Sequence, residues 1–240
     1  MSRIDVLGVG FDSFTMEEAV EAALGFITER SARYVCTPNP EIVMAARDNP
    51  ELKSALEGAD MVLADGVGVT KAAAMLKTPL KARLPGIDFA TNVISRLAEK
   101  GGSLYLFGAK PSVADAAAVN LAGKYPGIVI AGTSDGYFTD DIPIIDRINA
   151  ANPDFLMVCL GSPKQELWMA RNRGKLNCGL MAGLGGSLDV LAGNIRRAPE
   201  AWQKLGLEWL YRVIREPKRI GRIAKLPLFV LEAAAAGRRK

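Results

Sequence analysis

The chain of 240 residues contains no histidine. This absence excludes several kinds of catalytic site, because a Ser-His-Asp triad, a Cys-His pair and a histidine-ligated zinc ion all need that side chain. Any general base must therefore be an aspartate, a glutamate, a lysine or a tyrosine. The sequence also lacks an Asp-x-Asp tripeptide, which is a common carboxylate handle for a metal-bound diphosphate. We therefore expect a reaction without a metal ion or other cofactor.

Cysteine is scarce, and long apolar runs are missing. Cys36, Cys159 and Cys178 each lie in an apolar, strand-like run, and no two of them form a Cys-x-x-Cys motif. They are too few and too scattered for a disulfide scaffold, so we expect buried free thiols. No uninterrupted apolar run reaches about 18 residues, the length that a membrane-spanning helix needs. The first residues lack the apolar stretch of a secretory signal, and together these features predict a cytoplasmic protein.

Charge is distributed unevenly along the chain. Residues 1–195 carry 18 Lys and Arg against 22 Asp and Glu, whereas residues 196–240 carry 12 against 4. The hydrophobic share of 49% excludes a disordered chain and fits an ordinary globular protein. We expect a body, residues 1–195, followed by a basic helical appendage, residues 196–240. The positive charge of the appendage indicates an anionic partner, such as a membrane surface, a nucleic acid or a phosphorylated ligand.

Short apolar runs rich in β-branched residues alternate with stretches of helical periodicity. The pattern predicts strands at residues 4–9, 34–37, 61–64, 103–107, 128–131, 155–160 and 179–182. It predicts helices at residues 15–29, 41–46, 67–76, 88–100, 112–124, 142–149 and 164–173. Such alternation is typical of an α/β protein whose mostly parallel sheet is covered by helices on both faces.

Glycine and polar side chains follow six of the expected strands. Ligand sites in open parallel sheets lie beyond the carboxyl ends of the strands, so we expect these segments to form one site. The segments are Thr37-Pro38-Asn39-Pro40-Glu41, Asp65-Gly66-Val67-Gly68, Gly108-Ala109-Lys110-Pro111-Ser112, Gly132-Thr133-Ser134-Asp135-Gly136-Tyr137, Gly161-Ser162-Pro163-Lys164-Gln165-Glu166, and Gly183-Leu184-Gly185-Gly186-Ser187 with Asp189.

Two of these segments are candidate phosphate-binding turns, namely residues 108–110 and residues 183–187. A glycine turn that leads into a helix lets backbone N–H groups approach a phosphate. Neither turn is a G-x-G-x-x-G fingerprint, because Leu188 is the sixth residue when Gly183 is counted as the first, and the chain contains no P-loop. The turns therefore favour a nucleotide or sugar phosphate over a nicotinamide. The alternative for each is a turn that needs glycine only for its backbone angles.

Asp65 is the candidate general base, because a carboxylate at the end of an apolar strand can have a raised pKa. The alternative for Asp65 is an N-cap on the helix that follows. Thr37 and Asn39 are suited to bind hydroxyl groups or an amide, or else they only shape the turn. Arg83 can reach a phosphate or carboxylate from its loop, or it is simply exposed. Further substrate contacts are expected from Gly108, Ala109, Tyr137, Gln165, Glu166, Gly185, Gly186 and Asp189.

The basic appendage has the pattern of a helix that lies on a membrane. Residues 205–214 and 220–230 show helical periodicity, with a break at Pro217. Within the second stretch and the residues just before it, four basic side chains lie within about 120° of arc beside apolar positions. These are Lys218, Arg219, Arg222 and Lys225, and Trp202, Trp209 and Tyr211 lie nearby in the sequence. The alternative is a solvated helix face. A nucleic-acid partner is disfavoured, because the body is acidic and contains no known binding module.

Together these segments match a pattern that spans nearly the whole chain. The pattern includes the segments after the second, third, sixth and seventh expected strands. It also includes four further segments, namely Arg83-Leu84-Pro85-Gly86-Ile87-Asp88, Leu167-Trp168, Arg197-Ala198-Pro199 and Gly206-Leu207-Glu208-Trp209-Leu210-Tyr211-Arg212. In this combination the chain resembles the WecG/TagA/CpsF family of bacterial glycosyltransferases. It departs from the family pattern at Leu188, where phenylalanine is common, and in the alanine-rich end after Pro227.

The resemblance implies a Rossmann-like sheet and a metal-independent transfer with inversion at the anomeric carbon. It implies a UDP-activated N-acetylmannosamine-type donor and a polyprenyl-diphosphate N-acetylglucosamine acceptor at the cytoplasmic face of the membrane. Asp65 matches the family's proposed general base, and the matching pocket residues are Thr37, Asn39, Arg83 and Gln165.

The resemblance also implies that the appendage engages the membrane and covers the site, and that the body forms homo-oligomers. We expect the appendage, when it folds over the pocket, to offer positive charge to the departing UDP from Arg212, Arg215, Arg219 and Arg222.

Three matters stay open at this point. The donor sugar is N-acetylmannosamine or its uronic acid, and the downstream polymer and the subunit count are undetermined. A nucleotide-binding oxidoreductase on the same sheet is the second functional class, although the chain shows no dinucleotide fingerprint. A non-catalytic scaffold on the membrane surface is the third.

Overall fold

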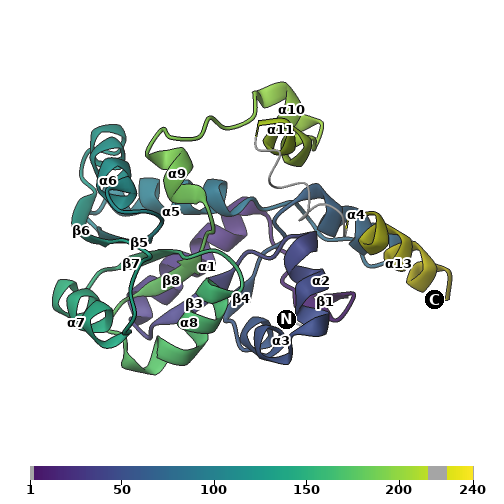
Figure 1. Ribbon diagram of the computed structural model, residues 1–240, viewed down its shortest axis with the longest axis horizontal. Coiled ribbons are helices and arrows are strands. Elements are labelled where there is room, and N and C mark those ends of the chain that lie inside the picture. Colours follow the sequence, from purple (N-terminus) through teal and green to yellow (C-terminus); the bar gives the residue numbers. More distant parts are fainter. Residues whose placement is uncertain (1–2, 216–225, 240) are drawn as a thin grey trace.

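The fold is built around one six-stranded sheet. The structure is a computed structural model that describes residues 3–215 and 226–239 (Figure 1). All strands of this sheet are parallel, and their spatial order is β4-β3-β8-β7-β5-β6. The strands are β3 (Arg33–Cys36), β4 (Met61–Val62), β5 (Ser103–Gly108), β6 (Val129–Ser134), β7 (Phe155–Cys159) and β8 (Leu180–Gly183). Because the strands are parallel, all their carboxyl ends lie at one edge of the sheet.

Helices cover both faces of the sheet and give three layers. One face packs against α1 (Met16–Glu29), α5 (Gly86–Ala98), α6 (Val113–Lys124) and α9 (Ser187–Leu191). The other packs against α2 (Pro40–Asp48), α3 (Pro50–Glu57), α4 (Val67–Met75), α7 (Ile142–Ala151), α8 (Lys164–Asn172) and α13 (Leu226–Arg239). A short 3₁₀ turn, η1 (Arg173–Lys175), follows α8. The predicted α/β architecture with a Rossmann-like parallel sheet is therefore confirmed.

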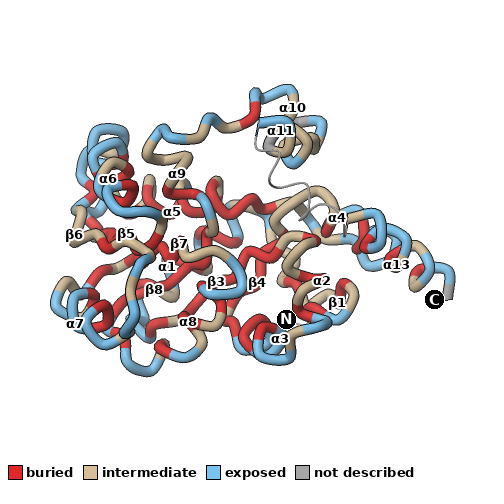
Figure 2. Tube along the Cα trace, viewed as in Figure 1, coloured by how far each residue is buried: buried red, intermediate tan, exposed pale blue. Residues whose placement is uncertain are grey.

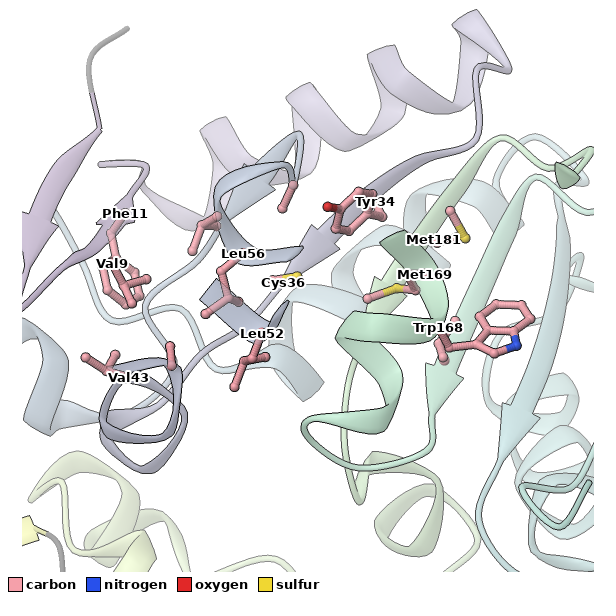
Figure 3. Close-up of a cluster of buried hydrophobic side chains, with 14 of the residues drawn as sticks. Val9, Phe11, Tyr34, Cys36, Val43, Leu52, Leu56, Trp168, Met169 and Met181 are labelled. Atoms are coloured by element: carbon pink, nitrogen blue, oxygen red, sulfur yellow. The ribbon is translucent and has the colours of Figure 1, made fainter. Parts of the chain in front are cut away.

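The strands are buried on both sides, which explains their continuous apolar sequences. In β3, Tyr34 and Cys36 point into one apolar cluster and Val35 into the other, as the two-residue period of a strand requires. Figure 2 shows buried backbone running through the middle of the molecule, with exposed segments on the outer helices. Figure 3 shows Met169 of α8 between Cys36 and Trp168, which belong with Tyr34 to the same apolar cluster.

The amino-terminal run was expected to be one strand over residues 4–9, and this prediction is wrong. The chain instead forms an antiparallel hairpin of β1 (Ile4–Val6) and β2 (Val9–Phe11), separate from the main sheet. The turn consists of Leu7 and Gly8, with φ angles of 55° and 92°. Two successive positive φ angles reverse a strand within two residues, and Gly8 adopts such an angle without steric cost.

The first part of the appendage differs from the single helix expected over residues 205–214. It contains two short helices, α10 (Glu200–Lys204) and α11 (Glu208–Arg215). Gly206, with φ of 70°, lies between them and ends the first helix. Figure 1 shows α10 and α11 above the body, joined to α9 by an extended segment. Pro217 and the basic residues Lys218, Arg219, Arg222 and Lys225 lie outside the described residues.

The last helix, α13, packs against the body beside α2 and α4 (Figure 1). Phe229 and Ala233 have no exposed surface and belong to the cluster on that face of the sheet. Gly237 approaches α4 so closely that a β-carbon there would lie 2.1 Å from the carbonyl oxygen of Met75. The alanine-rich end is therefore a packing surface, because small side chains allow the two helices to approach. The division of the chain after residue 195 stays a prediction.

Candidate active site

Backbone hydrogen bonds bring the loops after β3 and β4 together at the carboxyl edge. The amide of Asp65 donates to the carbonyl oxygen of Pro38 at 3.2 Å. The amide of Leu84, next to Arg83, donates to the carbonyl oxygen of Ala64 at 2.9 Å. The loop that carries Asp65 is thus bonded to the loop of Asn39 on one side and to the loop of Arg83 on the other, at the carboxyl edge of the sheet.

The first residues of α2 and α4 are packed against each other. Asn39 is the N-cap of α2, and its side-chain oxygen accepts a hydrogen bond from the amide of Ile42 at 3.0 Å. A β-carbon on Gly68 would lie 2.6 Å from Cγ of Pro40, so only glycine fits at that position. The amino ends of two helices, with their partial positive charge, therefore converge beside Asp65.

Asp65 lies just before α4 and does not occupy its N-cap position. That position belongs to Gly66, whose φ of 100° suits glycine. The N-cap alternative for Asp65 is therefore wrong. Asp65 and Arg83 are both half-buried residues of these adjoining loops. A carboxylate and a guanidinium thus stand on adjoining loops, which suits proton removal beside a developing negative charge.

Thr37 connects this group of loops to the turn after β8. Thr37 is only 7% exposed, and its hydroxyl donates a hydrogen bond to the carbonyl oxygen of Gly183 at 2.8 Å. A β-carbon on Gly86, the first residue of α5, would lie 2.9 Å from the Thr37 hydroxyl oxygen. The hydroxyl therefore touches the ends of two strands and the start of a helix, and it fixes their mutual positions.

Gln165 and Glu166 form a buried, hydrogen-bonded pair at the start of α8. Gln165 begins the buried stripe of this helix, which continues through Trp168, Met169 and Asn172. Its side-chain nitrogen donates to Oε1 of Glu166 at 2.9 Å, and its side-chain oxygen accepts from the amide of Gly185 at 2.9 Å. The pair therefore holds the glycine turn after β8 in place. Both side chains are almost wholly enclosed, at 3% and 1% exposed.

Burial raises the pKa of the Glu166 carboxyl above its usual range. Its Oε2 atom is buried and makes no hydrogen bond. Ionisation of this carboxyl is therefore less favourable in the folded protein than in water. The sequence placed Glu166 among the substrate contacts, but it gave no sign of this burial.

The two candidate phosphate turns lie at the same edge. Gly108 has φ of 128°, and a β-carbon there would lie 2.3 Å from the carbonyl oxygen of Cys159. Ala109 accepts a hydrogen bond from the amide of Gly136 at 2.9 Å, which joins the loops after β5 and β6. Tyr137, next in that loop, is 69% exposed. In the second turn, Gly185 has φ of 54°, Gly186 is exposed, and Asp189 in the first turn of α9 is half-buried.

The appendage touches the site at the start of α4. A β-carbon on Gly206 would lie 3.1 Å from Cγ2 of Val67, two residues after Asp65. Arg215 in α11 is exposed, and its guanidinium lies 5.6 Å from the ring centre of Tyr211. Arg212 belongs to α11, whereas Arg219 and Arg222 lie outside the described residues. The contact of Gly206 places the turn between α10 and α11 beside the candidate base.

The sequence reasoning assigned no role to an ion cluster at the same edge. Arg197 makes a bidentate pair with Asp88 of α5 and lies 3.6 Å from Oε1 of Glu208. Opposite charges that are 109 residues apart in sequence carry no local signal of their contact.

The remaining titratable groups fit a structural role. Cys36, Cys159 and Cys178 are free and buried, as predicted, and burial raises the pKa of Cys159 and Cys178 to about 12. Within residues 3–215 and 226–239 no group of three or more Cys, Asp or Glu is arranged to hold a metal ion. In the same part of the chain, no helix is long and apolar enough to cross a membrane.

The all-parallel sheet, with glycine turns and polar side chains gathered at its carboxyl edge, defines an α/β protein of the Rossmann-like class. A family model described as the glycosyl transferase WecG/TagA/CpsF family matches residues 4–240. The chain therefore belongs to this glycosyltransferase family, and the resemblance inferred from the sequence is confirmed.

Curated proteins of the same length class share more than a third of their residues with this chain. A protein of Staphylococcus aureus strain MW2 is 36% identical over 240 residues, which cover 99% of this chain and 94% of the relative. It is named N-acetylglucosaminyldiphosphoundecaprenol N-acetyl-beta-D-mannosaminyltransferase. A protein of strain NCTC 8325 carries the same name at the same identity and coverage.

Proposed function

We propose that this chain transfers N-acetylmannosamine from UDP-N-acetylmannosamine to the 4-hydroxyl of N-acetylglucosaminyl-diphosphoundecaprenol. The proposal is supported by membership of the glycosyltransferase family and by the name of relatives that match almost the full chain. The observation that supports the chemistry is that Asp65, a half-buried residue, lies on a loop joined by backbone hydrogen bonds to the loops of Asn39 and Arg83.

In this mechanism Asp65 is the general base. Its carboxylate takes the proton of the acceptor hydroxyl while that oxygen forms a bond to the anomeric carbon of the donor. The bond between the anomeric carbon and the phosphate oxygen breaks at the same time, and UDP departs from the opposite face. Inversion follows, because attack and departure occur on opposite faces of one carbon. The proton ends on Asp65 and the negative charge on UDP.

The departing UDP needs positive partners in a reaction without metal. Arg83 is the side chain of the body best placed for this role, since its loop adjoins the end of β4. Further candidates are backbone N–H groups of the turns at residues 108–110 and 183–187, with Gly108, Gly186 and Asp189 in or beside these turns. They exclude the amides that already donate within the protein, such as those of Ala109 and Gly185, which donate to Cys159 and Gln165. The appendage adds Arg212, Arg215, Arg219 and Arg222 in this proposal. Thr37, Gln165 and Glu166 shape the pocket, and Tyr137 contacts substrate from its exposed loop.

The acceptor carries a polyprenyl chain, so the reaction belongs at a membrane. We propose that the protein binds peripherally to the inner face of the cell membrane through its basic appendage. The product then enters the linkage unit of a teichoic acid or a related cell-surface polysaccharide. Homo-oligomers form through the body in this proposal, and no nucleic acid takes part.

The test is a transfer assay with a short-chain N-acetylglucosaminyl-diphospholipid, followed by mass analysis. UDP-N-acetylmannosamine and its uronic acid are offered separately, each with and without EDTA. The expected result is an acceptor that gains one N-acetylmannosamine residue, unaffected by EDTA. Transfer of the uronic acid alone would replace the donor in the proposal, and no transfer from either donor would refute it.

A thermal-shift measurement tests the class of ligand independently. UDP is expected to raise the melting temperature, because a ligand that binds only the folded state stabilises it. NAD serves as the control and is expected to leave it unchanged. Stabilisation by NAD and not by UDP would favour an oxidoreductase.

A further inference from the structure

Arg197 holds three separate parts of the chain together. It lies in the segment between α9 and α10, and its two terminal nitrogens bind both carboxylate oxygens of Asp88. The pair of Nη2 and Oδ2 is 2.7 Å long. Its Nε lies 3.6 Å from Oε1 of Glu208, the first residue of α11. One guanidinium thus links α5, the segment after α9, and α11.

Both partners of Arg197, Asp88 and Glu208, lie close in sequence to residues that contact the candidate site. Asp88 lies in the first turn of α5, which begins with Gly86 against the hydroxyl of Thr37. Glu208 follows shortly after Gly206, which rests on Val67 beside Asp65. The cluster therefore sets the distance between α11 and the loops that carry the candidate base.

The pair has the geometry of a strong, specific contact. The side chains of Arg197, Asp88 and Glu208 are only 25%, 32% and 13% exposed. The hydrogen bond to Asp88 raises the pKa of Arg197, so the guanidinium stays charged. A planar fork that meets a carboxylate with two parallel bonds fixes orientation as well as distance, which lysine cannot do.

Part of the apolar surface of α10, α11 and the turn between them is open to solvent. Several of their large apolar side chains face solvent, namely Leu205, Trp209 and Ile214 at 70%, 41% and 61% exposed. Trp202 and Tyr211 pack on each other, with ring centres 5.7 Å apart, so this contact lies within the unit. The ion pairs of Arg197 with Asp88 and Glu208 are therefore specific contacts that tie the described part of α11 to α5.

We propose that Arg197 is a positioning residue for sugar transfer, which keeps α11 at the edge of the site by binding Asp88 and Glu208 together. The guanidinium does not touch the reacting atoms in this account. It acts through α11, so its loss leaves the body folded but lets α11 leave the site. The activity part of this inference rests on the proposed function.

The test compares full-length Arg197→Met with wild type in two measurements. Hydrogen exchange of the amides at residues 208–215 is expected to speed up at least about 10-fold in the variant. The kcat of transfer is expected to fall about 10- to 100-fold, since misplacement of a supporting element by about 1 Å costs that much. Arg197→Lys keeps the charge without the fork and is expected to recover part of both effects.

Two further variants separate positioning from general damage. Asp88→Asn removes the same pair from the α5 side, and adding Arg197→Met to it should cause little further loss of kcat. Arg30→Met is the matched control, because Arg30 pairs with Asp154 at 2.8 Å near the amino ends of the strands. Its kcat is expected to stay within about twofold of wild type, because this pair lies at the opposite edge of the sheet from the candidate site.

The inference is overturned if Arg197→Met leaves exchange at residues 208–215 unchanged. It is also overturned if exchange rises while kcat stays at the wild-type value, or if Arg30→Met lowers kcat as much as Arg197→Met does. A wild-type protein that transfers neither donor sugar would refute the proposed function instead. The exchange measurement would then still decide whether Arg197 holds α11.

Discussion

The hydroxyl of Thr37 donates a hydrogen bond to the carbonyl oxygen of Gly183, at 2.8 Å. These two residues stand at the ends of β3 and β8, which are neighbours in the middle of the sheet. The bond couples the loop that carries Asn39 to the turn that carries Gly185. Backbone pairing of β3 with β8 joins the two strands, and this buried side chain adds a direct bond between the segments that follow them.

Replacing Thr37 by valine is therefore expected to damage both stability and transfer. The variant keeps the shape but loses a buried hydrogen bond, which costs about 1–3 kcal/mol of unfolding free energy. The kcat is expected to fall because the hydrogen bond that fixes the two loops relative to each other is lost. Thr37→Ser, which keeps the hydroxyl, is the control. Urea unfolding and the transfer assay measure the effects, and equal values for all three proteins would contradict the role of this bond.

The burial of Glu166 predicts how the stability of the protein depends on pH. Burial raises its pKa in the folded state above the usual 4.5, so the folded protein holds this proton more tightly than the unfolded chain does. Below the pKa of the unfolded chain, Glu166 is protonated in both states, so it does not change the unfolding free energy with pH there. As the pH rises from there to the folded pKa, the unfolded chain ionises first, and the unfolding free energy falls.

Glu166→Gln removes this proton and should remove its share of the pH dependence. Its amide oxygen can still accept the hydrogen bond from Gln165. The unfolding free energy of the variant should therefore gain on the wild type as the pH rises above 4.5, by at most about 1.4 kcal/mol per pH unit. Urea unfolding at a series of pH values measures the difference. A difference that does not change with pH would show that folding leaves the pKa of Glu166 unshifted.

The packing of α13 predicts that the end of the chain contributes to the stability of the body. Phe229 is wholly buried on α13, whereas Leu231 on the same helix is 67% exposed. Phe229→Ala is expected to cost about 3–5 kcal/mol of unfolding free energy, and Leu231→Ala less than about 0.5 kcal/mol. If Phe229→Ala unfolds at the same urea concentration as wild type, α13 is not docked on the body in solution.

Much of the fold follows from local patterns in the sequence. The apolar runs at β5 and β7 are bounded by glycine and polar residues, and Thr15 and Glu18 form the capping box that opens α1. The hairpin at Leu7 and Gly8 was not predicted, because a two-residue turn inside a short apolar run looks like part of one strand. Helix α3 was also missed, although Asn49 caps it and Pro50 is its first residue.

The site was predictable only in part, for a physical reason. Parallel strands place their carboxyl ends together, so the segments around Thr37, Asp65 and Gly185 were expected to meet, and they do. The burial of Glu166 and the pairing of Arg197 with Asp88 depend on contacts between distant segments. No periodicity or spacing in the sequence reports such contacts.

The central claim is that Asp65 removes the proton from the attacking hydroxyl. The most direct measurement is the turnover of Asp65→Asn in the transfer assay, with the UDP thermal shift of the same variant recorded alongside. The claim predicts that kcat falls about 10²- to 10⁴-fold while UDP still raises the melting temperature as it does for wild type. An Asp65→Asn protein that transfers sugar at close to the wild-type rate would contradict it.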